Sequence, residues 1–186
     1  MVRDEFEFRK MNQLRKNDKS SEQRWDDKIK ELCEKINKTK DYYTTSSCAG
    51  RVVLVKGIPK KAEDIFLFKS HNKVSFSEIK KALEEINYKK LIYFKQEPFI
   101  LHVACRTLED AENLLDKARD AGIKKKGIIT TRSRVIVELN GTEKLELPIT
   151  EELTDNYLKF LLKEANSRLE RTWEKLAKLE RRFRKV

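Results

Sequence analysis

The chain has 186 residues, enough for one ordinary domain with a substantial core. Its 42 Lys and Arg against 31 Asp and Glu give a net charge of +11, which favours a polyanionic partner such as nucleic acid over a Lys- and Glu-rich surface that merely leans positive. The three cysteines have no close spacing and no apolar run has the length of a membrane span, which argues against a disulfide framework, a metal centre and a membrane protein and predicts a cytoplasmic one.

The first part of the chain predicts two helices and two strands. Residues 3–16 and 26–37 carry apolar side chains at helical spacing among charges. Residues 51–56 are a β-branched run between glycines and predict a buried strand, and residues 65–68 predict a second, shorter one. A polar stretch rich in hydroxyl groups separates the second helix from the first of these strands.

A helix and two strands are predicted in the middle of the chain. Ser75 or Ser77 can cap the helix, because a serine hydroxyl accepts a hydrogen bond from the free N–H groups of the first turn. The strands are expected at residues 91–95 and 99–105, on either side of a Glu-Pro pair. We expect these two strands to be adjacent.

The last third predicts a helix, three strands and a long helix. Thr107 begins the first helix, and Gly122 is a suitable residue for its C-terminal end. Asn140-Gly141 predicts a tight hairpin turn between two of the strands. A helical pattern then runs over residues 150–186 with a heptad-spaced apolar seam. The strands are expected at 127–130, 135–139 and 145–148, and the seam consists of Leu169, Trp173, Leu176 and Phe183.

Interleaved helices and strands together with hairpins predict an α+β or α/β fold with one mixed central sheet flanked by helices. We expect a single domain over residues 1–186, with 150–186 as a C-terminal helical extension. No G-x-G-x-x-G follows a strand, and the P-loop, H-E-x-x-H and G-x-S-x-G patterns do not occur. These observations argue against a Rossmann methyltransferase, a P-loop NTPase, a zincin and an α/β-hydrolase.

The stretch Tyr42-Tyr43-Thr-Thr-Ser-Ser-Cys-Ala-Gly-Arg51 places hydroxyls, a thiol, a glycine and an arginine just before a strand. Ser46 and Ser47 could hydrogen-bond a ligand there, while Arg51 could pair with its carboxylate or phosphate. This chemistry suits a nucleotide or a cofactor that carries an amino acid. The alternative is a polar loop with an arginine at the edge of a sheet.

A second polar stretch, residues 97–106, has the sequence E-P-F-I-L-H-V-A-C-R. The two-residue period of a strand puts His102 and Arg106 on the same face. An imidazole can accept a proton near neutral pH, and a guanidinium beside it would depress its pKa and keep it neutral. The alternative is a histidine bonded to the backbone of a half-buried strand.

Two groups of basic residues are candidates for contact with RNA phosphates. Arg132 and Arg134 follow Lys124-Lys125-Lys126 and could be presented on strands as a rigid surface. His71 lies next to Lys69 after a predicted short strand and could be a second base or an RNA contact. A surface histidine in a basic turn is the alternative for His71.

The two polar stretches, Y-x-T-T-S-S-C-x-G-R and E-P-F-I-L-H-V-x-C-R, with an isolated histidine between them, closely resemble the wybutosine-synthesising methyltransferases that act on phenylalanine tRNA. The resemblance extends from the first helix to Pro148. It implies an S-adenosylmethionine donor and methylation of N(4) of the tricyclic 7-aminocarboxypropyl-demethylwyosine base, which lies 3′ of the anticodon of tRNA-Phe.

The resemblance also implies roles for individual residues. The family has an Asp-x-Ser loop that Asp18, Ser20 and Asp26 fit, although Glu22-Gln23 stand where Lys-Gly would be. His102 or Asp18 could take the proton of the acceptor nitrogen, and the sequence does not rank the two. The resemblance and the chemistry of the residues together give the expected sites. The catalytic residues are His102, Ser47 and Asp18; the donor-binding residues are Ser46, Ser47, Cys48, Gly50, Arg51, Cys105 and Arg106; the RNA-binding residues are His71, Lys69, Arg132, Arg134 and Tyr43.

The bulk properties leave two further functions open. The chain could be a basic RNA-binding module without catalysis, or a protein that binds a small molecule in the Ser-Ser-Cys loop. A pure RNA-binding module would not need the dense hydroxyl, thiol and imidazole chemistry of the two stretches, which is why the sequence favours a tRNA methyltransferase.

Overall fold

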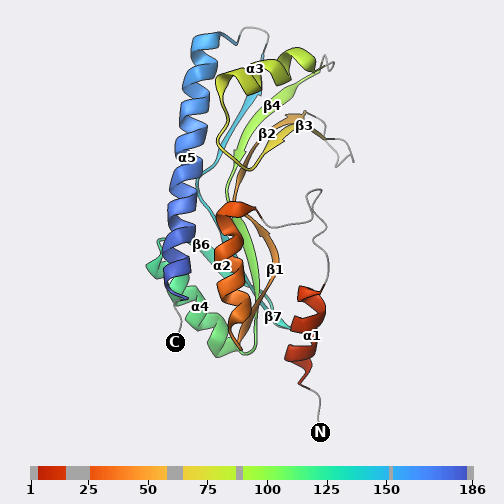
Figure 1. Ribbon diagram of the computed structural model, residues 1–186, viewed down its shortest axis with the longest axis vertical. Coiled ribbons are helices and arrows are strands. Elements are labelled where there is room, and N and C mark those ends of the chain that lie inside the picture. The colour runs from red at the N-terminus through yellow and green to blue at the C-terminus, as the bar shows by residue number, and fades with distance from the viewer. Residues whose placement is uncertain (1–3, 16–25, 58–64, 87–89, 151–152, 184–186) are drawn as a thin grey trace. The chain divides into compact units, whose positions relative to one another are not determined.

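The computed structural model describes residues 4–15, 26–57, 65–86, 90–150 and 153–183 (Figure 1). It has the α+β composition expected from the sequence, and every pair of neighbouring strands is antiparallel. The helices are α1 (Glu5–Leu14), α2 (Asp27–Lys38), α3 (Phe76–Glu85), α4 (Leu108–Asp120) and α5 (Asp155–Arg181). The strands are β1 (Tyr42–Cys48), β2 (Arg51–Lys56), β3 (Phe66–Ser70), β4 (Ile92–Glu97), β5 (Ile100–Cys105), β6 (Lys125–Thr130), β7 (Val135–Asn140) and β8 (Leu145–Ile149).

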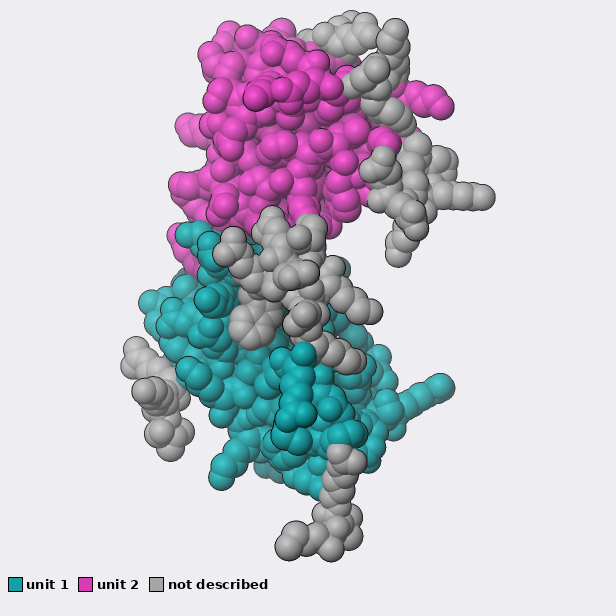
Figure 2. Space-filling model, turned by 45° about the vertical axis from the view of Figure 1, so that its right-hand side comes forward, with its two compact units in different colours: residues 1–49, 100–141, 175–186 teal, residues 50–99, 142–174 magenta. Residues whose placement is uncertain are grey.

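The chain forms two compact units, and each of them contains one four-stranded sheet (Figure 2). Unit 1 comprises residues 1–49, 100–141 and 175–186, and its sheet has the strand order β1-β5-β7-β6. Unit 2 comprises residues 50–99 and 142–174, and its sheet has the order β3-β2-β4-β8. The expected long C-terminal helix is present as α5. The expectation of a single domain over 1–186 stays a prediction.

The prediction of one mixed central sheet is wrong, because the strands divide between two antiparallel sheets. β4 and β5 were expected to be adjacent but belong to different sheets, so Glu97-Pro98 is a passage between sheets. Asn140-Gly141 was expected to form a hairpin turn, yet β7 pairs with β5 and β6 while β8 pairs with β4. Among the described glycines only Gly50 and Gly122 have the positive φ that such a turn requires.

Local capping signals place the helix ends correctly. Ser75 caps α3 and forms a reciprocal capping box with Glu78, whose carboxylate accepts the Ser75 backbone N–H at 2.7 Å. This hydrogen bond and the one from the Ser75 hydroxyl lower the pKa of Glu78. Thr107 caps α4 in the same way with Asp110, and Gly122 follows the end of α4 with a φ of 80°. These contacts join residues at most four positions apart, which is why the sequence predicts them.

The sheet of unit 1 has two faces with different coverings. On the inner face the Tyr42 hydroxyl donates to the carbonyl of Asp110 in α4, and Asn37 of α2 bonds Thr44. Side chains of β1 and β5 on this face are Tyr42, Thr44, Ser47, Leu101, Val103 and Cys105. On the outer face the side chains of β1 and β5 are Tyr43, Ser46, Cys48, Ile100, His102 and Ala104. Helix α1 lies on this outer face, where Phe6 packs on Tyr43, Ala104 and Ile136.

A β-bulge in β1 sets which hydroxyl lies on which face. The register with β5 shifts between Thr44 and Ser46, so that Tyr43 and Ser46 lie on the same face although they are three residues apart. A regular strand would have placed Ser47 with Tyr43 instead. The bulge therefore exchanges the two serines between the faces of the sheet.

The core of unit 2 lies between its sheet and helices α3 and α5. Buried residues of this core include Val52, Leu54, Ile79, Phe94, Leu158, Leu161 and Leu169. The expected apolar seam of the last helix is covered within the protein: Leu169 belongs to this core, and Phe183 of unit 1 packs edge-on against Tyr42. None of the helices in the described residues has both the length and the apolar character that crossing a membrane requires.

Candidate active site

Three strands of unit 1 bring a serine, a histidine and a glutamate into line on the outer face. Ser46 of β1 lies opposite His102 of β5, which lies opposite Glu138 of β7. The His102 Nε2 and a Glu138 carboxylate oxygen are 2.9 Å apart. The side chains of His102 and Glu138 are 25% and 28% exposed, and Ser46 is exposed. The three side chains therefore form a row, and within the described part of the chain this row is partly accessible to solvent.

The bond to Glu138 determines how His102 can act. An ionised carboxylate can only accept hydrogen bonds, so Nε2 carries the hydrogen of this contact. The lone pair of the ring is then on Nδ1, which is the atom that can accept a proton. The arrangement is a base with a carboxylate that holds its ring and its tautomer, as in other histidine-dependent sites.

Glu138 is a functional candidate that the sequence analysis missed. The signal was present, because Glu138 is a charged residue inside the apolar strand Val-Ile-Val-Glu-Leu. It was not interpretable from sequence, since the partner of Glu138 lies 36 residues away and the pairing of β5 with β7 was not predicted.

Arg106 lies on the outer face with His102, as the alternation predicted, but its guanidinium is occupied. It donates at 2.7 Å to Asp4 and to Glu7 and at 3.1 Å to the carbonyl of Lys40, and it stacks 4.5 Å from the centre of the Phe6 ring. Its hydrogen bond to Asp4 raises the pKa of Arg106 and lowers that of Asp4. The charged partner of His102 is thus Glu138. The ion pairs of Arg106 with Asp4 and Glu7 instead hold α1 against the sheet.

Three other predicted site residues differ in their accessibility. Cys105 is 1% exposed on the inner face, where burial first, and then the charge of Asp110, raise the pKa of its thiol to about 12. A thiol with that pKa in the core is inert and does not contact a donor. Tyr43 is fully buried against Phe6, so its ring is not available to stack on an RNA base. Ser47 lies on the inner face opposite Leu101, away from His102.

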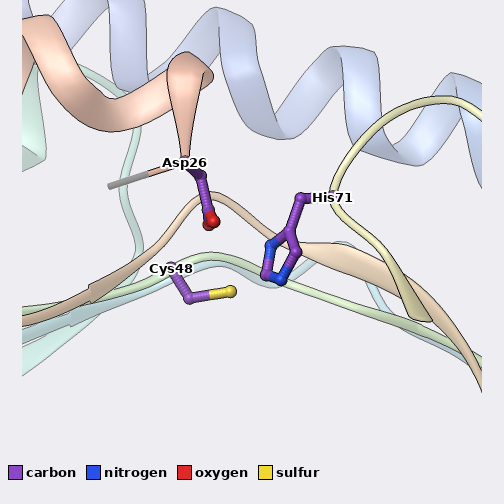
Figure 3. A group of neighbouring side chains, drawn as sticks. All are labelled: Asp26, Cys48 and His71. Carbon is purple, nitrogen blue, oxygen red and sulfur yellow. The ribbon is translucent and has the colours of Figure 1, made fainter. Parts of the chain in front are cut away.

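Asp26 and Cys48 lie together at the end of β1 (Figure 3). Figure 3 shows the Asp26 side chain directed from the start of α2 toward Cys48, and the carboxylate oxygen and the sulfur lie within 4.8 Å. The Asp26 carboxylate accepts the backbone N–H of Ala49 at 2.8 Å, which fixes the strand end. Asp26 is therefore a further functional candidate at this end of β1, next to Cys48. His71, also drawn in Figure 3, belongs to unit 2 and is half-buried after β3.

Gly50 and Arg51 belong to unit 2 and have definite structural roles. Gly50 has a φ of 95°, and a Cβ there would lie 3.0 Å from the carbonyl oxygen of Glu97, so that only glycine fits without strain. The Arg51 Nε donates to the Glu97 carboxylate at 2.6 Å, and its guanidinium lies 4.8 Å from the centre of the Phe66 ring. Arg51 thus already binds a carboxylate, the chemistry expected of it, and is about a quarter exposed.

The remaining predicted residues lie on surfaces or outside the described residues. Arg132 and Arg134 are exposed in the connection between β6 and β7. Lys69 is exposed on β3 in unit 2. Asp18, the alternative base, lies outside the described residues, as do Ser20 and Glu22-Gln23.

Comparisons with known proteins agree over most of the chain. Residues 8–185 match the family described as Methyltransferase TYW3. The chain is similar to the tRNA wybutosine-synthesizing protein 3 homolog of Mus musculus, with 35% identity over 89% of this chain and 68% of the mouse protein. It is also similar to the tRNA(Phe) 7-((3-amino-3-carboxypropyl)-4-demethylwyosine(37)-N(4))-methyltransferase of Methanocaldococcus jannaschii, with 38% identity over 85% of this chain and 86% of that protein.

The fold is similar to solved structures of related sequence. The PH1069 protein from Pyrococcus horikoshii superimposes with a TM-score of 0.84 at 30% identity, and 97% of each chain is covered. A hypothetical protein from Aeropyrum pernix gives a TM-score of 0.73 at 26% identity over 85% of this chain and 96% of the other. The arrangement of two antiparallel sheets and a long last helix is therefore shared with these proteins.

Proposed function

Since the chain belongs to the methyltransferase TYW3 family, we propose that it uses S-adenosylmethionine to methylate N(4) of the 7-aminocarboxypropyl-demethylwyosine base of tRNA-Phe. The base lies 3′ of the anticodon, and the reaction takes place in the cytoplasm. The observation that carries the proposal is the His102–Glu138 pair on the outer face of unit 1, inside the region that matches the family.

The residues of the chain fit an amino-acid-bearing donor. Arg51 and Glu97 present a cation and a carboxylate side by side, each about a third exposed or less. This pair complements the α-carboxylate and α-ammonium groups of the amino-acid end of S-adenosylmethionine. The donor supplies an electrophilic methyl group on a sulfonium. Arg51 of unit 2 stays in the proposed donor set, whereas Arg106 and Cys105 leave it because Arg106 is bonded to Asp4 and Glu7 and Cys105 is buried.

His102 supplies the proton acceptor that the transfer needs. The bound donor would supply the methyl group to the acceptor nitrogen, with the carbon–sulfur bond breaking, and the free ring nitrogen of His102 would accept the N–H proton. Glu138 holds the imidazole and stabilises the imidazolium that results. The rest of the catalysis is positioning, because methyl transfer needs the three reacting atoms in line.

A methyl-transfer assay tests the proposal. Donor labelled in the methyl group is incubated with tRNA-Phe that carries the demethylated tricyclic base and, as a control, with the same tRNA bearing an unmodified guanine. We expect label only in the first tRNA. Calorimetry with the donor completes the test: donor binding without transfer to either tRNA contradicts the proposed acceptor, and the absence of donor binding contradicts the enzyme altogether.

A further inference from the structure

The row of Ser46, His102 and Glu138 continues onto a fourth strand, where it ends on a residue without a side chain. Gly127 of β6 lies directly opposite Glu138 in the antiparallel register. Residues opposite one another in a sheet point to the same face, so the bare backbone of Gly127 lies beside the carboxylate of the His102–Glu138 pair. The row therefore passes from polar side chains to a flat strip of main chain.

Nothing within the described fold requires glycine at this position. A Cβ built on Gly127 has no heavy atom within 4 Å, and the residue does not have a positive φ. Glycine in a strand interior weakens the strand, and β-branched residues are preferred there. The register of β6 shifts between Ile128 and Thr130, and a strand glycine is typical both of a bulge and of a place where a ligand approaches the sheet closely. The open space above Gly127 and its position beside the His102–Glu138 pair favour the second role.

The neighbouring part of the outer face shows what a side chain would do there. One step along the sheet, Tyr43, Ala104 and Ile136 are buried beneath Phe6 of α1. The row with Gly127 is not covered in this way, because His102 and Glu138 keep about a quarter of their side-chain surface exposed. The outer face is thus apolar and closed at one end and polar and partly open at the other.

The charges beside this strip suit a nucleic acid rather than a neutral small molecule. Lys125 begins β6 two residues before Gly127 and is exposed, and Arg132 and Arg134 are exposed in the connection to β7. Cations at the rim of a flat surface can hold phosphates while a base lies on the surface, as in single-strand-binding sheets. A fused tricyclic base offers a large planar face for such a contact.

We propose that the acceptor base lies on the outer face across β7 and β6, with its plane over Gly127 and its edge toward His102 and Glu138. This inference rests on the proposed function and names where the single-stranded RNA substrate binds. Glycine at position 127 lets the ring system approach the main chain, and any side chain there would lift the base away from the histidine.

A size series at Gly127 tests the placement. Gly127→Ala and Gly127→Val are compared for binding to an anticodon stem-loop with the tricyclic base, for donor binding by calorimetry and for thermal unfolding. We expect the dissociation constant of the stem-loop to rise slightly for Ala and roughly tenfold for Val, as for the loss of one stacked base. Donor affinity should not change, and the unfolding temperature should stay the same or rise because β-propensity improves.

Thr130→Val is the matched control, because it places the same side chain on the same strand opposite Ile136, at the end that α1 covers. It should leave stem-loop affinity unchanged. Equal stem-loop affinities for the wild type and a folded Gly127→Val variant would overturn the placement of the base. Stem-loop binding is measured without turnover. If the Gly127 variants lose affinity as expected but the wild type transfers no methyl group, the result counts against the proposed function and not against the placement of the base.

Discussion

His102 in β5 and Arg106 directly after it lie on the same face of the sheet, and the two residues differ in how their polar groups are used. Their side chains are 25% and 27% exposed, so exposure does not distinguish them. Arg106 is bonded to Asp4, Glu7 and the Lys40 carbonyl and stacks on Phe6, whereas the His102 ring has one hydrogen bond among the described residues, to Glu138.

The contacts of a polar residue on a strand therefore decide its role. They determine whether it stabilises the fold or is available for the reaction. The Arg106 guanidinium is held by two carboxylates and a carbonyl, while an imidazole bonded at one nitrogen keeps the other for a proton. Residues of helix α1 bind the Arg106 guanidinium, whereas His102 is bonded to Glu138 of β7.

The largest effect is expected from His102→Ala. Removal of a general base lowers turnover by roughly 10²- to 10⁴-fold, and we expect kcat for methyl transfer to fall within that range. Stem-loop and donor affinities should stay within a few-fold, and so should the fold as followed by circular dichroism. A variant that keeps more than a tenth of wild-type turnover would transfer the role of base to another group, with Asp18 the first to examine.

Arg106→Met should cost stability instead of catalysis. The apolar stem keeps its packing on Phe6, but Asp4, Glu7 and the Lys40 carbonyl lose charge-assisted hydrogen bonds. After allowance for partial exposure, we expect the free energy of unfolding to fall by about 2 kcal/mol. Urea denaturation measures this change. A normal unfolding midpoint combined with lost turnover would return Arg106 to the substrate site.

A smaller effect on rate is expected from Glu138→Gln. The amide can no longer fix the tautomer of His102 or stabilise its charged form, so kcat should fall by roughly tenfold, less than the loss of the base itself. KM for tRNA should not change, and Glu138→Asp should recover part of the rate. Steady-state kinetics separate the two parameters. A rise in KM at constant kcat would make Glu138 a substrate contact.

Substitution of Ser46 should lower kcat/KM more than substitution of Ser47, although the sequence alone pointed to Ser47 as the catalytic serine. Ser46 shares the outer face with His102, and Ser47 lies on the inner face. We expect Ser46→Ala to lower kcat/KM a few-fold, on the order of one hydrogen bond, and Ser47→Ala to lower it less. If Ser47→Ala were the slower enzyme, the bulge between Thr44 and Ser46 would be placed wrongly.

The smallest effect is on the pH dependence of stability. The hydrogen bond from Arg106 holds the pKa of Asp4 below its usual value of 3.8. A lowered carboxyl pKa contributes stability that is present above the unfolded pKa and is lost as the pH falls through the folded one. The wild type should therefore lose more stability than Arg106→Met between about pH 4 and pH 2. Thermal unfolding across that range measures the difference, and parallel curves for the two proteins would contradict it.

The predictions that held depend on neighbours in the sequence. Ser75 with Glu78, and Thr107 with Asp110, cap their helices through contacts three residues apart. The placing of His102 and Arg106 on one face follows from the period of a strand. Asn140-Gly141 failed because the turn preference of two residues is weaker than the pairing of β7 with β5 and β6.

Local sequence predicted the helix caps, seven of the strands, and the shared face of His102 and Arg106. It did not predict β1 (Tyr42–Cys48), which was expected as a polar stretch before a strand. Only the tertiary structure decided that β5 pairs with β7, which gives His102 its carboxylate, and that a bulge puts Ser46 rather than Ser47 beside it. Capping and alternation act over a few residues and are encoded locally. Strand pairing and the covering of a face join distant segments, and packing of the whole unit selects among the alternatives that local sequence allows.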